Sequence, residues 1–285
     1  MEYEGLICHP PMERSSFMLP VAVGCAYSRC KFCVFFKHLR HRLLPLEQIE
    51  AELRRVRDLG GNPKQVFLGD GNAFGMETAH LLSILERIYH YFPGCRMVNM
   101  DATVMNIRDK TDEELRQLKE AGVNRLYLGI ECGLDDVLAF MQKGHNVAQA
   151  EWEIRRMRDA GLIFNAHIMT GVAGAGRGLE NAEKLAEFFN STRPERIVNF
   201  SLFLSQSAPL CQDILAGRYV PADEVENLVE ARRLVELLET DSMFDGFHDQ
   251  LEFRVRGMLP QDRESMLRKL DEAIAVHGRV EPVFV

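Results

Sequence analysis

The stretch Val23-Gly24-Cys25-Ala26-Tyr27-Ser28-Arg29-Cys30-Lys31-Phe32-Cys33 directly follows an apolar run that predicts a strand. It places Cys25, Cys30 and Cys33 within nine residues, with no fourth cysteine nearby. Thiolates are the ligands that iron–sulfur clusters take, and three of them leave one iron of a cubane cluster without a protein ligand. Because an open iron can bind and activate a small molecule, the spacing predicts a [4Fe-4S] cluster with a chemical role.

Zinc is the alternative metal for this loop. A structural zinc site closes its tetrahedral coordination with a fourth Cys or a His. His38 and His41 follow the cysteines at loop distance and are the two residues that such a site would use. The sequence favours the cluster over zinc because the three sulfurs lie so close together in the chain.

The spacing C-x4-C-x2-C, with an aromatic residue before the last cysteine, resembles a variant of the radical S-adenosylmethionine (radical SAM) signature, whose common form is C-x3-C-x2-C. Further segments follow in the order expected for the radical SAM proteins loosely labelled coproporphyrinogen-oxidase-like, which lack a B12 domain. They are Arg42-Leu43-Leu44-Pro45-Leu46-Glu47, Phe67-Leu68-Gly69-Asp70-Gly71-Asn72-Ala73, Leu126-Tyr127-Leu128-Gly129-Ile130-Glu131-Cys132-Gly133 and Met141-Gln142-Lys143-Gly144.

The resemblance implies a partial (β/α)6 barrel that binds a [4Fe-4S] cluster and S-adenosylmethionine (SAM). In such proteins one electron from the reduced cluster cleaves SAM, and the resulting 5′-deoxyadenosyl radical abstracts a hydrogen atom from a substrate. A small reductant such as flavodoxin or ferredoxin would supply the electron. The barrel serves many reactions, so the resemblance leaves the substrate open.

The resemblance also implies which residues contact SAM. The turn after the second strand would approach the SAM ammonium group, Glu131 would bind its ribose or amino group, and Phe32 would pack beside the adenine. A glycine-rich turn and the exit of the sixth strand would shape the adenine pocket. The residues are Phe32, Gly69, Asp70, Gly71, Glu131, Gly171 and Leu204. Read without the resemblance, the same residues are an ordinary turn, a helix N-terminal charge and core positions.

Composition excludes several classes of protein. The chain has 285 residues, 46% hydrophobic content and a net charge of −8, and an acidic chain disfavours an extended nucleic-acid surface. Seven cysteines in this length are too few for a disulfide scaffold and predict a reducing cytoplasm. The acidic start Met1-Glu2-Tyr3-Glu4 does not resemble a signal peptide, and no apolar run is long enough to span a membrane.

Apolar runs alternate with amphipathic segments, which predicts a parallel α/β sheet with right-handed crossovers. The predicted strands are 17–23, 65–68, 96–100, 125–130, 163–169 and 196–204. The predicted helices are 46–59, 78–91, 112–121, 147–160, 179–189, 221–238 and 262–277, and Gly60, Gly122 and Gly161 close three of them. We expect an N-terminal segment over residues 1–15, the partial barrel over 16–210, and a helical C-terminal extension that completes or caps the barrel over 211–285.

Alternation along four of these strands predicts an unusually polar barrel lumen, because helices cover the outward, apolar positions. The predicted inward positions include Asn99 and Asp101 in the third strand, Tyr127 and Glu131 in the fourth, Asn165 and His167 in the fifth, and Asn199 and Ser201 in the sixth. Such a lumen suits a polar substrate, although the same groups would also satisfy one another with trapped water. Tyr127, His167 and Asp101 are the candidates for catalysis by proton or hydrogen transfer.

A basic segment over residues 29–42 would hold an anionic group of SAM or of the substrate, although a solvated loop has the same composition. Three functions remain in competition. The favoured one is a radical SAM enzyme acting on a small polar or anionic substrate. A tetrapyrrole-directed enzyme and a non-catalytic, cluster-bearing haem- or iron-binding protein are the alternatives, and a tRNA-modifying enzyme is disfavoured by the charge.

Overall fold

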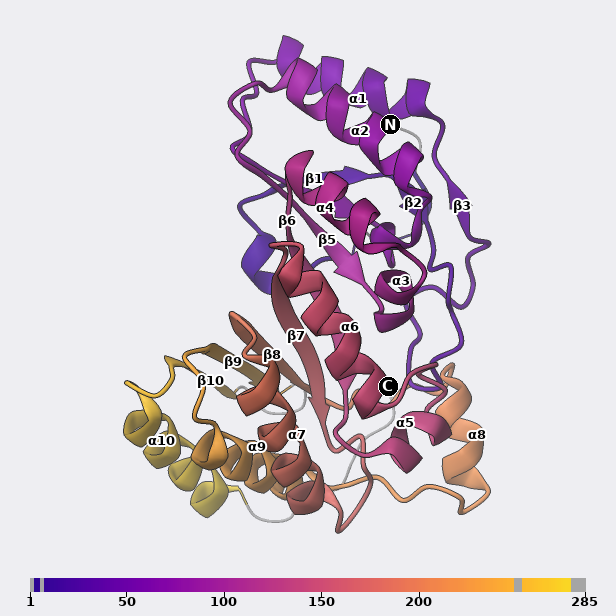
Figure 1. Cartoon of the computed structure of the whole chain (residues 1–285). Coiled ribbons are helices and arrows are strands. Elements are labelled where there is room, and N and C mark those ends of the chain that lie inside the picture. The colour runs from indigo at the N-terminus through magenta and orange to yellow at the C-terminus, as the bar shows by residue number, and fades with distance from the viewer. Residues whose placement is uncertain (1–2, 6–7, 249–252, 278–285) are drawn as a thin grey trace. The chain divides into compact units, whose positions relative to one another are not determined.

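The computed structural model describes residues 3–5, 8–248 and 253–277 (Figure 1). The described residues fall into two compact units. The first draws on residues 1–28, 35–128 and 156–163, and the second on residues 29–34, 129–155 and 164–285. Three elements run through the boundaries between these ranges: strand β6 (Val123–Glu131), helix α6 (Val147–Asp159) and strand β7 (Ile163–Thr170).

A sheet of parallel strands forms the first unit, in the order β1, β4, β5 and β6. Helix α1 packs against α2, and α2 packs against α4 (Figure 1). The strands other than β6 are β1 (Phe17–Pro20), β4 (Gln65–Gly69) and β5 (Met97–Ala102). The helices are α1 (Leu46–Asp58), α2 (Thr78–Tyr91), α3 (Val104–Arg108) and α4 (Asp112–Glu120), with the 3-10 turns η1 (Pro11–Glu13) and η2 (Ala73–Gly75).

Helix α4 shows how the sequence specifies these elements. Its N-cap Thr111 accepts the backbone N–H of Glu114, whose carboxylate in turn accepts the N–H of Thr111. Leu115 and Leu118, three residues apart, are fully buried. Transfer of each side chain from water to the core contributes about 1.5–3 kcal/mol to the stability of the fold. The predicted glycine ends are confirmed for three helices, all with positive φ: Gly60, Gly122 and Gly161.

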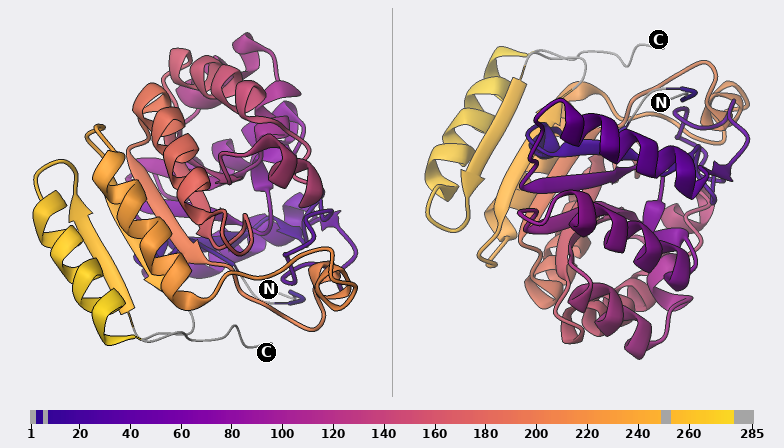
Figure 2. Two further views of the ribbon diagram at one scale, coloured as in Figure 1. Left: turned by 90° about the horizontal axis from the view of Figure 1, so that it is seen from below. Right: turned by 90° about the horizontal axis from the view of Figure 1, so that it is seen from above.

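The second unit continues with β7 and β8 in parallel, β9 parallel to β8, and β10 antiparallel to β9. Helix α9 packs against both α7 and α10, and Figure 2 shows α9 and α10 side by side. The strands added here are β8 (Arg196–Ser201), β9 (Met243–His248) and β10 (Phe253–Met258). The helices are α5 (Asp135–Phe140), α7 (Gly178–Thr192), α8 (Pro209–Leu215), α9 (Glu224–Leu237) and α10 (Arg263–Val276).

The predicted α/β fold with a mostly parallel sheet is confirmed, but the first predicted strand is two strands. The chain changes partners at Val21, whose N–H bonds to the carbonyl of Gly69 and whose carbonyl accepts the N–H of Leu44 at 2.9 Å. Strand β1 therefore belongs to the parallel sheet, while β2 (Ala22–Val23) pairs antiparallel with β3 (Arg42–Leu43). This switch directs the chain into the cysteine loop.

The C-terminal region predicted as a helical extension also contributes the two strands β9 and β10. The period-two signal was present in β10, where Val255 and Gly257 are buried while Arg254 and Arg256 are exposed. Two arginines and a glycine in six residues make the segment too polar to stand out as a strand in the sequence. Its pairing with β9 is what identifies the segment as a strand.

The predicted facing of the sixth strand is wrong. In β7 and β8, His167 pairs with Val198 and Ile168 pairs with Asn199, and residues paired in a parallel sheet point to the same side. Asn199 therefore shares a face with Ile168, not with His167. Gly257 lies on the same face as Asn199, and a Cβ there would meet Met266 of α10 at 2.6 Å. Asn199 thus lies on the helix-covered side, and Val198 lies on the side of His167.

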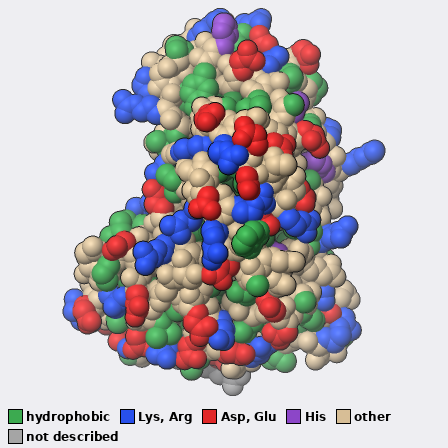
Figure 3. Space-filling view, in the orientation of Figure 1, with side chains coloured by type: hydrophobic (Ala, Val, Ile, Leu, Met, Phe, Trp, Pro, Cys, Tyr) green, Lys and Arg blue, Asp and Glu red, His purple; other side chains and the backbone are tan. Residues whose placement is uncertain are grey.

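Among the described residues, no helix combines the length and the apolar content needed to cross a membrane. On the face shown in Figure 3, acidic and basic side chains are interspersed. This mixed surface agrees with the modest net charge of −8.

Candidate active site

The first unit holds Cys25 against the end of β4. Cys25 follows Gly24 in the loop after β2, and the amide oxygen of Asn72 accepts both the Cys25 thiol at 3.4 Å and the Ala26 N–H at 3.1 Å. The amide nitrogen of Asn72 donates to Asn106 at 3.1 Å, which fixes the orientation of the Asn72 side chain. The cysteine loop is therefore tied to the βα turn in which the sequence places a SAM contact.

Gly71 has to be a glycine for this approach. Its φ is +62°, and a Cβ there would lie 2.5 Å from the carbonyl oxygen of Gly24 and 2.9 Å from the Cα of Cys25. Any side chain would push the cysteine loop off the turn, because both contacts are with backbone atoms. The motif Gly69-Asp70-Gly71 thus has a structural reason besides its predicted contact with SAM.

Asp70, the middle residue of that turn, is occupied within the protein. Its carboxylate accepts the hydroxyl of Tyr3 and, at 3.1 Å, the N–H of Cys8. The side chain is buried, and this burial raises the Asp70 pKa although the hydrogen bonds oppose the shift. Asp70 therefore anchors the N-terminal segment, and its predicted contact with SAM stays a prediction.

The second unit holds the other two cysteines in a loop with several anchors. The N–H of Lys31 donates to the carbonyl of Met141 at 3.1 Å, and the carbonyl of Lys31 accepts the N–H of Leu210 at 2.9 Å. The ammonium group of Lys31 lies 2.9 Å from Asp213 and 3.9 Å from the ring centroid of Phe140. Cys30 and Cys33 thus flank a segment that is fixed to α8 and to the end of α5.

Lys143 and Glu131 form a buried ion pair in the same unit. The ammonium group of Lys143 lies 3.0 Å from a carboxylate oxygen of Glu131, with side-chain exposures of 7% and 12%. Burial alone would lower the Lys143 pKa, but Glu131 and the thiols of Cys30 and Cys33 raise it above its usual value. Lys143 therefore stays protonated beside the two cysteines.

Backbone strain accompanies this pair. Glu131 has a φ of +66° at the end of β6, and Gln142 has a φ of +58° just before Lys143. Positive φ in residues other than glycine is uncommon and gathers at functional sites. Sequence reasoning found Glu131 but missed Lys143, although the segment Met141-Gln142-Lys143-Gly144 carried part of the resemblance.

Phe32 completes this side of the site. Its ring lies 5.7 Å from the Lys143 ammonium group and packs, partly buried, on a hydrophobic core that contains Val172, Leu204 and Leu210. The side chain of Leu204 is 3% exposed within that core. A protonated amine, a carboxylate and an aromatic ring therefore lie together beside Cys30 and Cys33.

The glycine-rich turn after β7 is bound to the protein at both backbone atoms of Gly171. Its N–H donates to Glu230 at 2.8 Å, and its carbonyl accepts the hydroxyl of Tyr219 at 2.7 Å. The other Glu230 oxygen accepts the amide of Asn181 at 2.6 Å, and the Asn181 oxygen accepts the thiol of Cys132 at 3.1 Å. This buried network fixes the turn after β7 to the turn after β6. The predicted contact of Gly171 with SAM stays a prediction.

Tyr127 and Asp101 are neighbours in the register of β5 and β6 and share a face. The Tyr127 hydroxyl donates to Glu13 at 2.7 Å, and the same carboxylate oxygen accepts the amide of Asn99 at 2.9 Å. Glu13 is 4% exposed and lies in η1, outside every predicted strand and helix, so no sequence pattern predicts its place on this face. A buried carboxylate thus occupies part of the polar face of the first unit.

His167 lies in the second unit, edge-on to Phe200 at a centroid distance of 5.9 Å. Burial and then the charge of Lys143 lower its pKa to about 4, so its imidazole is neutral near pH 7. A neutral imidazole has one nitrogen that can accept a proton and one N–H that can donate a hydrogen bond. The catalytic roles of Tyr127, His167 and Asp101 remain predictions.

The basic segment over residues 29–42 is less available to anions than its composition suggests. Lys31 pairs with Asp213, Lys37 donates to the carbonyl of Ser28 at 2.6 Å, and Arg42 pairs with Glu4 at 2.9 Å. Among the described residues, no three His, Cys, Asp or Glu side chains converge as they would around a single metal ion.

Comparison with known proteins gives the family. The radical SAM superfamily matches residues 19–189. The haem chaperone HemW of Bacillus subtilis is 25% identical over 205 residues, which cover 69% of this chain and 53% of that protein. A tRNA-2-methylthio-N(6)-dimethylallyladenosine synthase of Chlorobium luteolum is 23% identical over 79% of this chain and 49% of its own length.

A solved structure supports the fold. The coproporphyrinogen III oxidase HemN of Escherichia coli, described as a radical SAM enzyme, gives a TM-score of 0.52 at 16% identity, over 66% of this chain and 44% of that one. The chain spans about half the length of the curated relatives named here. The predicted resemblance is confirmed: the chain belongs to the radical SAM superfamily, whose members use a [4Fe-4S] cluster and SAM.

Proposed function

We propose that this protein is a radical SAM enzyme that cleaves SAM reductively and acts on a small polar or anionic substrate. The observation that carries the proposal is the group formed by Lys143, Glu131 and Phe32 beside Cys30 and Cys33. SAM carries an ammonium group, a carboxylate and an adenine ring. The group offers one partner for each: a carboxylate, an ammonium group and an aromatic ring.

The cysteines suit the cluster by the chemistry of their donor set. All three are partly exposed and form no disulfide within the described residues, and the protonated Lys143 offsets thiolate charge at Cys30 and Cys33. On the other unit, Gly71 leaves room for Cys25 where a Cβ would collide with the loop. Cys25, Cys30 and Cys33 would hold the cluster, which supplies the electron for cleaving SAM to a 5′-deoxyadenosyl radical.

This chain's own residues would bind and orient the cofactor. Glu131 would accept hydrogen bonds from the ribose or the ammonium group of SAM, and Lys143 would donate to its carboxylate. The network of Glu230, Asn181 and Cys132 would hold the two βα turns at a fixed separation. The neutral imidazole of His167 would face the substrate, with a reductant such as flavodoxin or ferredoxin as electron donor.

A non-catalytic haem-binding role is the second candidate, and the similarity to HemW favours it. That relative is named a haem chaperone, and this chain covers 53% of its length. Titration of the protein with haemin, followed by visible absorption, would give a saturable Soret shift if haem binds one site. A nucleic-acid substrate is disfavoured by the net charge of −8 and by the interspersed acidic and basic side chains on the face shown in Figure 3.

The experiment that tests the proposal is anaerobic reconstitution with iron and sulfide, followed by dithionite and SAM. Formation of 5′-deoxyadenosine, measured by chromatography with mass detection, should exceed that of a Cys30→Ala control. A matched control is Cys95→Ala, which removes a buried thiol outside the loop and should leave the product unchanged. Product no higher in the natural chain than in Cys30→Ala would reject the enzyme.

A further inference from the structure

Three arginines surround one buried carboxylate in the second unit. Asp245 of β9 is 1% exposed and accepts two hydrogen bonds from Arg254, each at 2.8 Å. Arg256 approaches the same carboxylate at 3.7 Å and Arg196 at 3.9 Å, beyond hydrogen-bonding distance. One negative charge therefore faces three positive charges.

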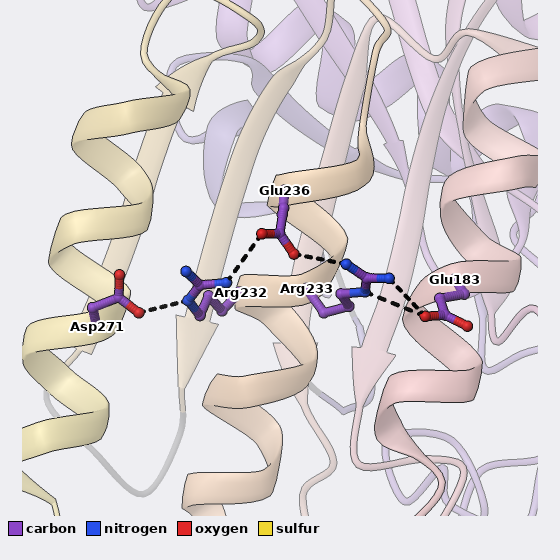
Figure 4. A network of polar contacts seen from close by, with 5 residues as sticks. All are labelled: Glu183, Arg232, Arg233, Glu236 and Asp271. Atoms are coloured by element: carbon purple, nitrogen blue, oxygen red, sulfur yellow. Dashed lines mark hydrogen bonds and ion pairs between the residues drawn. The ribbon is translucent and has the colours of Figure 1, made fainter.

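The neighbouring helices show what a balanced arrangement looks like. On α7, α9 and α10, Arg232 and Arg233 are shared among three acids: Asp271, Glu236 and Glu183 (Figure 4). Every guanidinium in that network has carboxylate partners at 3.5 Å or less. Around Asp245 the ratio among the described residues is reversed, and Arg196 and Arg256 make no hydrogen bond to this carboxylate, so their N–H donors can serve another anion.

The three arginines lie on one face of the sheet, and it is the face of His167. The register pairs Asn165 with Arg196, Val198 with Asp245, and Asp245 with Arg256. Residues paired across neighbouring strands, and every second residue along a strand, share a side. Helices α7, α9 and α10 therefore do not cover these arginines, and Arg254 and Arg256 are about half exposed.

An aromatic row connects the arginines with His167. The His167 ring lies edge-on to Phe200, Phe200 stacks on Phe247 at 5.7 Å, and the Arg254 guanidinium lies 4.4 Å from the centre of Phe247. The row crosses four neighbouring strands, a span of about 14 Å at the usual strand spacing. Aromatic rings with the N–H donors of a guanidinium group at one end form a surface for a flat or extended molecule that carries an acidic group.

Unused hydrogen-bonding groups lie at the same place. Both polar atoms of the Asn165 side chain, and one terminal nitrogen of Arg196, are buried without a hydrogen-bond partner among the residues that the structure describes. Asn165 is 0% exposed and sits beside Arg196 in the register. Buried polar atoms without partners cost free energy, so a site that a ligand or water completes explains them.

We propose that Arg196, Arg254 and Arg256 bind a carboxylate or phosphate group of the substrate, with the substrate body lying over Phe200 and Phe247. Only the identification of the bound anion as the substrate rests on the proposed function, because anion binding itself can be measured without turnover. Arginine suits the task since its planar fork matches both carboxylate and phosphate. Arg254 also holds Asp245, so Arg256 is the residue to change.

The test is calorimetric titration of the reconstituted protein with tricarballylate and, separately, with inorganic phosphate. We expect at least one of them to bind, and Arg256→Gln to weaken that binding about tenfold or more, as loss of a charge-assisted pair does. Arg256→Lys should lose part of the affinity, because it keeps the charge without the fork. The stronger of the two anions identifies the acidic group.

Arg232→Gln is the matched control, since it removes the same charge from the helix-covered side of the same unit. Equal affinities in Arg256→Gln and Arg232→Gln, or no binding of either anion, would overturn the proposal. In that case the arginines serve to neutralise Asp245 and to block pairing at the edge strand β10. Production of 5′-deoxyadenosine by the natural chain is scored separately. Its absence rejects the radical SAM activity, and equal anion affinities reject only this site.

Discussion

The ammonium group of Lys143 lies 3.0 Å from Glu131, and both side chains are largely buried. Two segments meet in this pair, the end of β6 and the turn after α5, each with a residue other than glycine at positive φ. A buried pair of this kind is weak evidence for stability, because desolvation offsets the attraction. Its place beside Cys30 and Cys33 is the reason for the proposed role in cofactor binding.

Removing one member of this pair should cost more stability than removing both. Lys143→Met leaves the Glu131 carboxylate buried and unpaired, and we expect a loss of about 3–5 kcal/mol in the free energy of unfolding. The double variant Glu131→Gln with Lys143→Met should regain most of it. Urea unfolding followed by circular dichroism measures all three proteins, and a double variant as unstable as the single one would contradict the pairing.

Gly71→Ala should prevent cluster assembly. The added Cβ would meet the Gly24 carbonyl at 2.5 Å, and φ is +62°. Gly60→Ala is the control, since its φ is +82° but no atom of the described residues lies within 4 Å of the new Cβ. The control should lose about 1 kcal/mol of stability, and Gly71→Ala a further 1–3 kcal/mol, roughly, from overpacking. Iron and acid-labile sulfide per chain should fall only in Gly71→Ala.

Glu230 should make the protein less stable as the pH rises. Burial raises its pKa from 4.5 to about 7, against the opposing hydrogen bonds of Gly171 and Asn181. Between these values the folded chain binds more protons than the unfolded chain. Stability therefore falls as the pH rises from 4.5 to 7, by roughly 3 kcal/mol for this group.

Unfolding free energies of the natural chain and of Glu230→Gln at closely spaced pH values measure that contribution as the difference in slope. We expect the variant to lack this part of the slope, although it will be less stable because its amide places a donor opposite Gly171 or Asn181. Identical slopes in the two proteins would show that Glu230 does not titrate in this range.

Tyr127→Phe should destabilise the first unit through Glu13. The hydroxyl that it removes donates at 2.7 Å to a buried carboxylate, and such a bond contributes about 1.5–3 kcal/mol. Tyr91→Phe removes a hydroxyl that donates at 2.9 Å to the half-exposed Glu50 and should cost less than about 1 kcal/mol. Thermal unfolding measures the loss of stability in each variant. Equal losses in Tyr127→Phe and Tyr91→Phe would mean that the Glu13 carboxylate is solvated.

The cysteine spacing predicts the cofactors, and the alternation of strands and helices predicts most of the fold. Buried strands such as β6 and long helices such as α2 are visible because their periodicity is continuous. Strand β10 is hard to recognise in the sequence because Arg254 and Arg256 occupy its exposed face. A short segment with such polar residues is equally typical of a loop.

The facing of β8 could not be read from the sequence either. Asn199 and Val198 are both fully buried, so alternation did not reveal which side the helices cover. The site was incomplete for a related reason. Lys143 and Glu13 owe their positions to segments far away in the chain, and no local pattern marks them.

The central claim is that Cys25, Cys30 and Cys33 hold a [4Fe-4S] cluster whose remaining iron is open to SAM. The most direct measurement is electron paramagnetic resonance of the anaerobically reconstituted, dithionite-reduced protein before and after adding SAM, with metal and sulfide analysis of the same sample. We predict a reduced-cluster signal that changes when SAM is added. A protein that holds zinc without acid-labile sulfide, or a cluster signal that SAM leaves unchanged, would contradict the account.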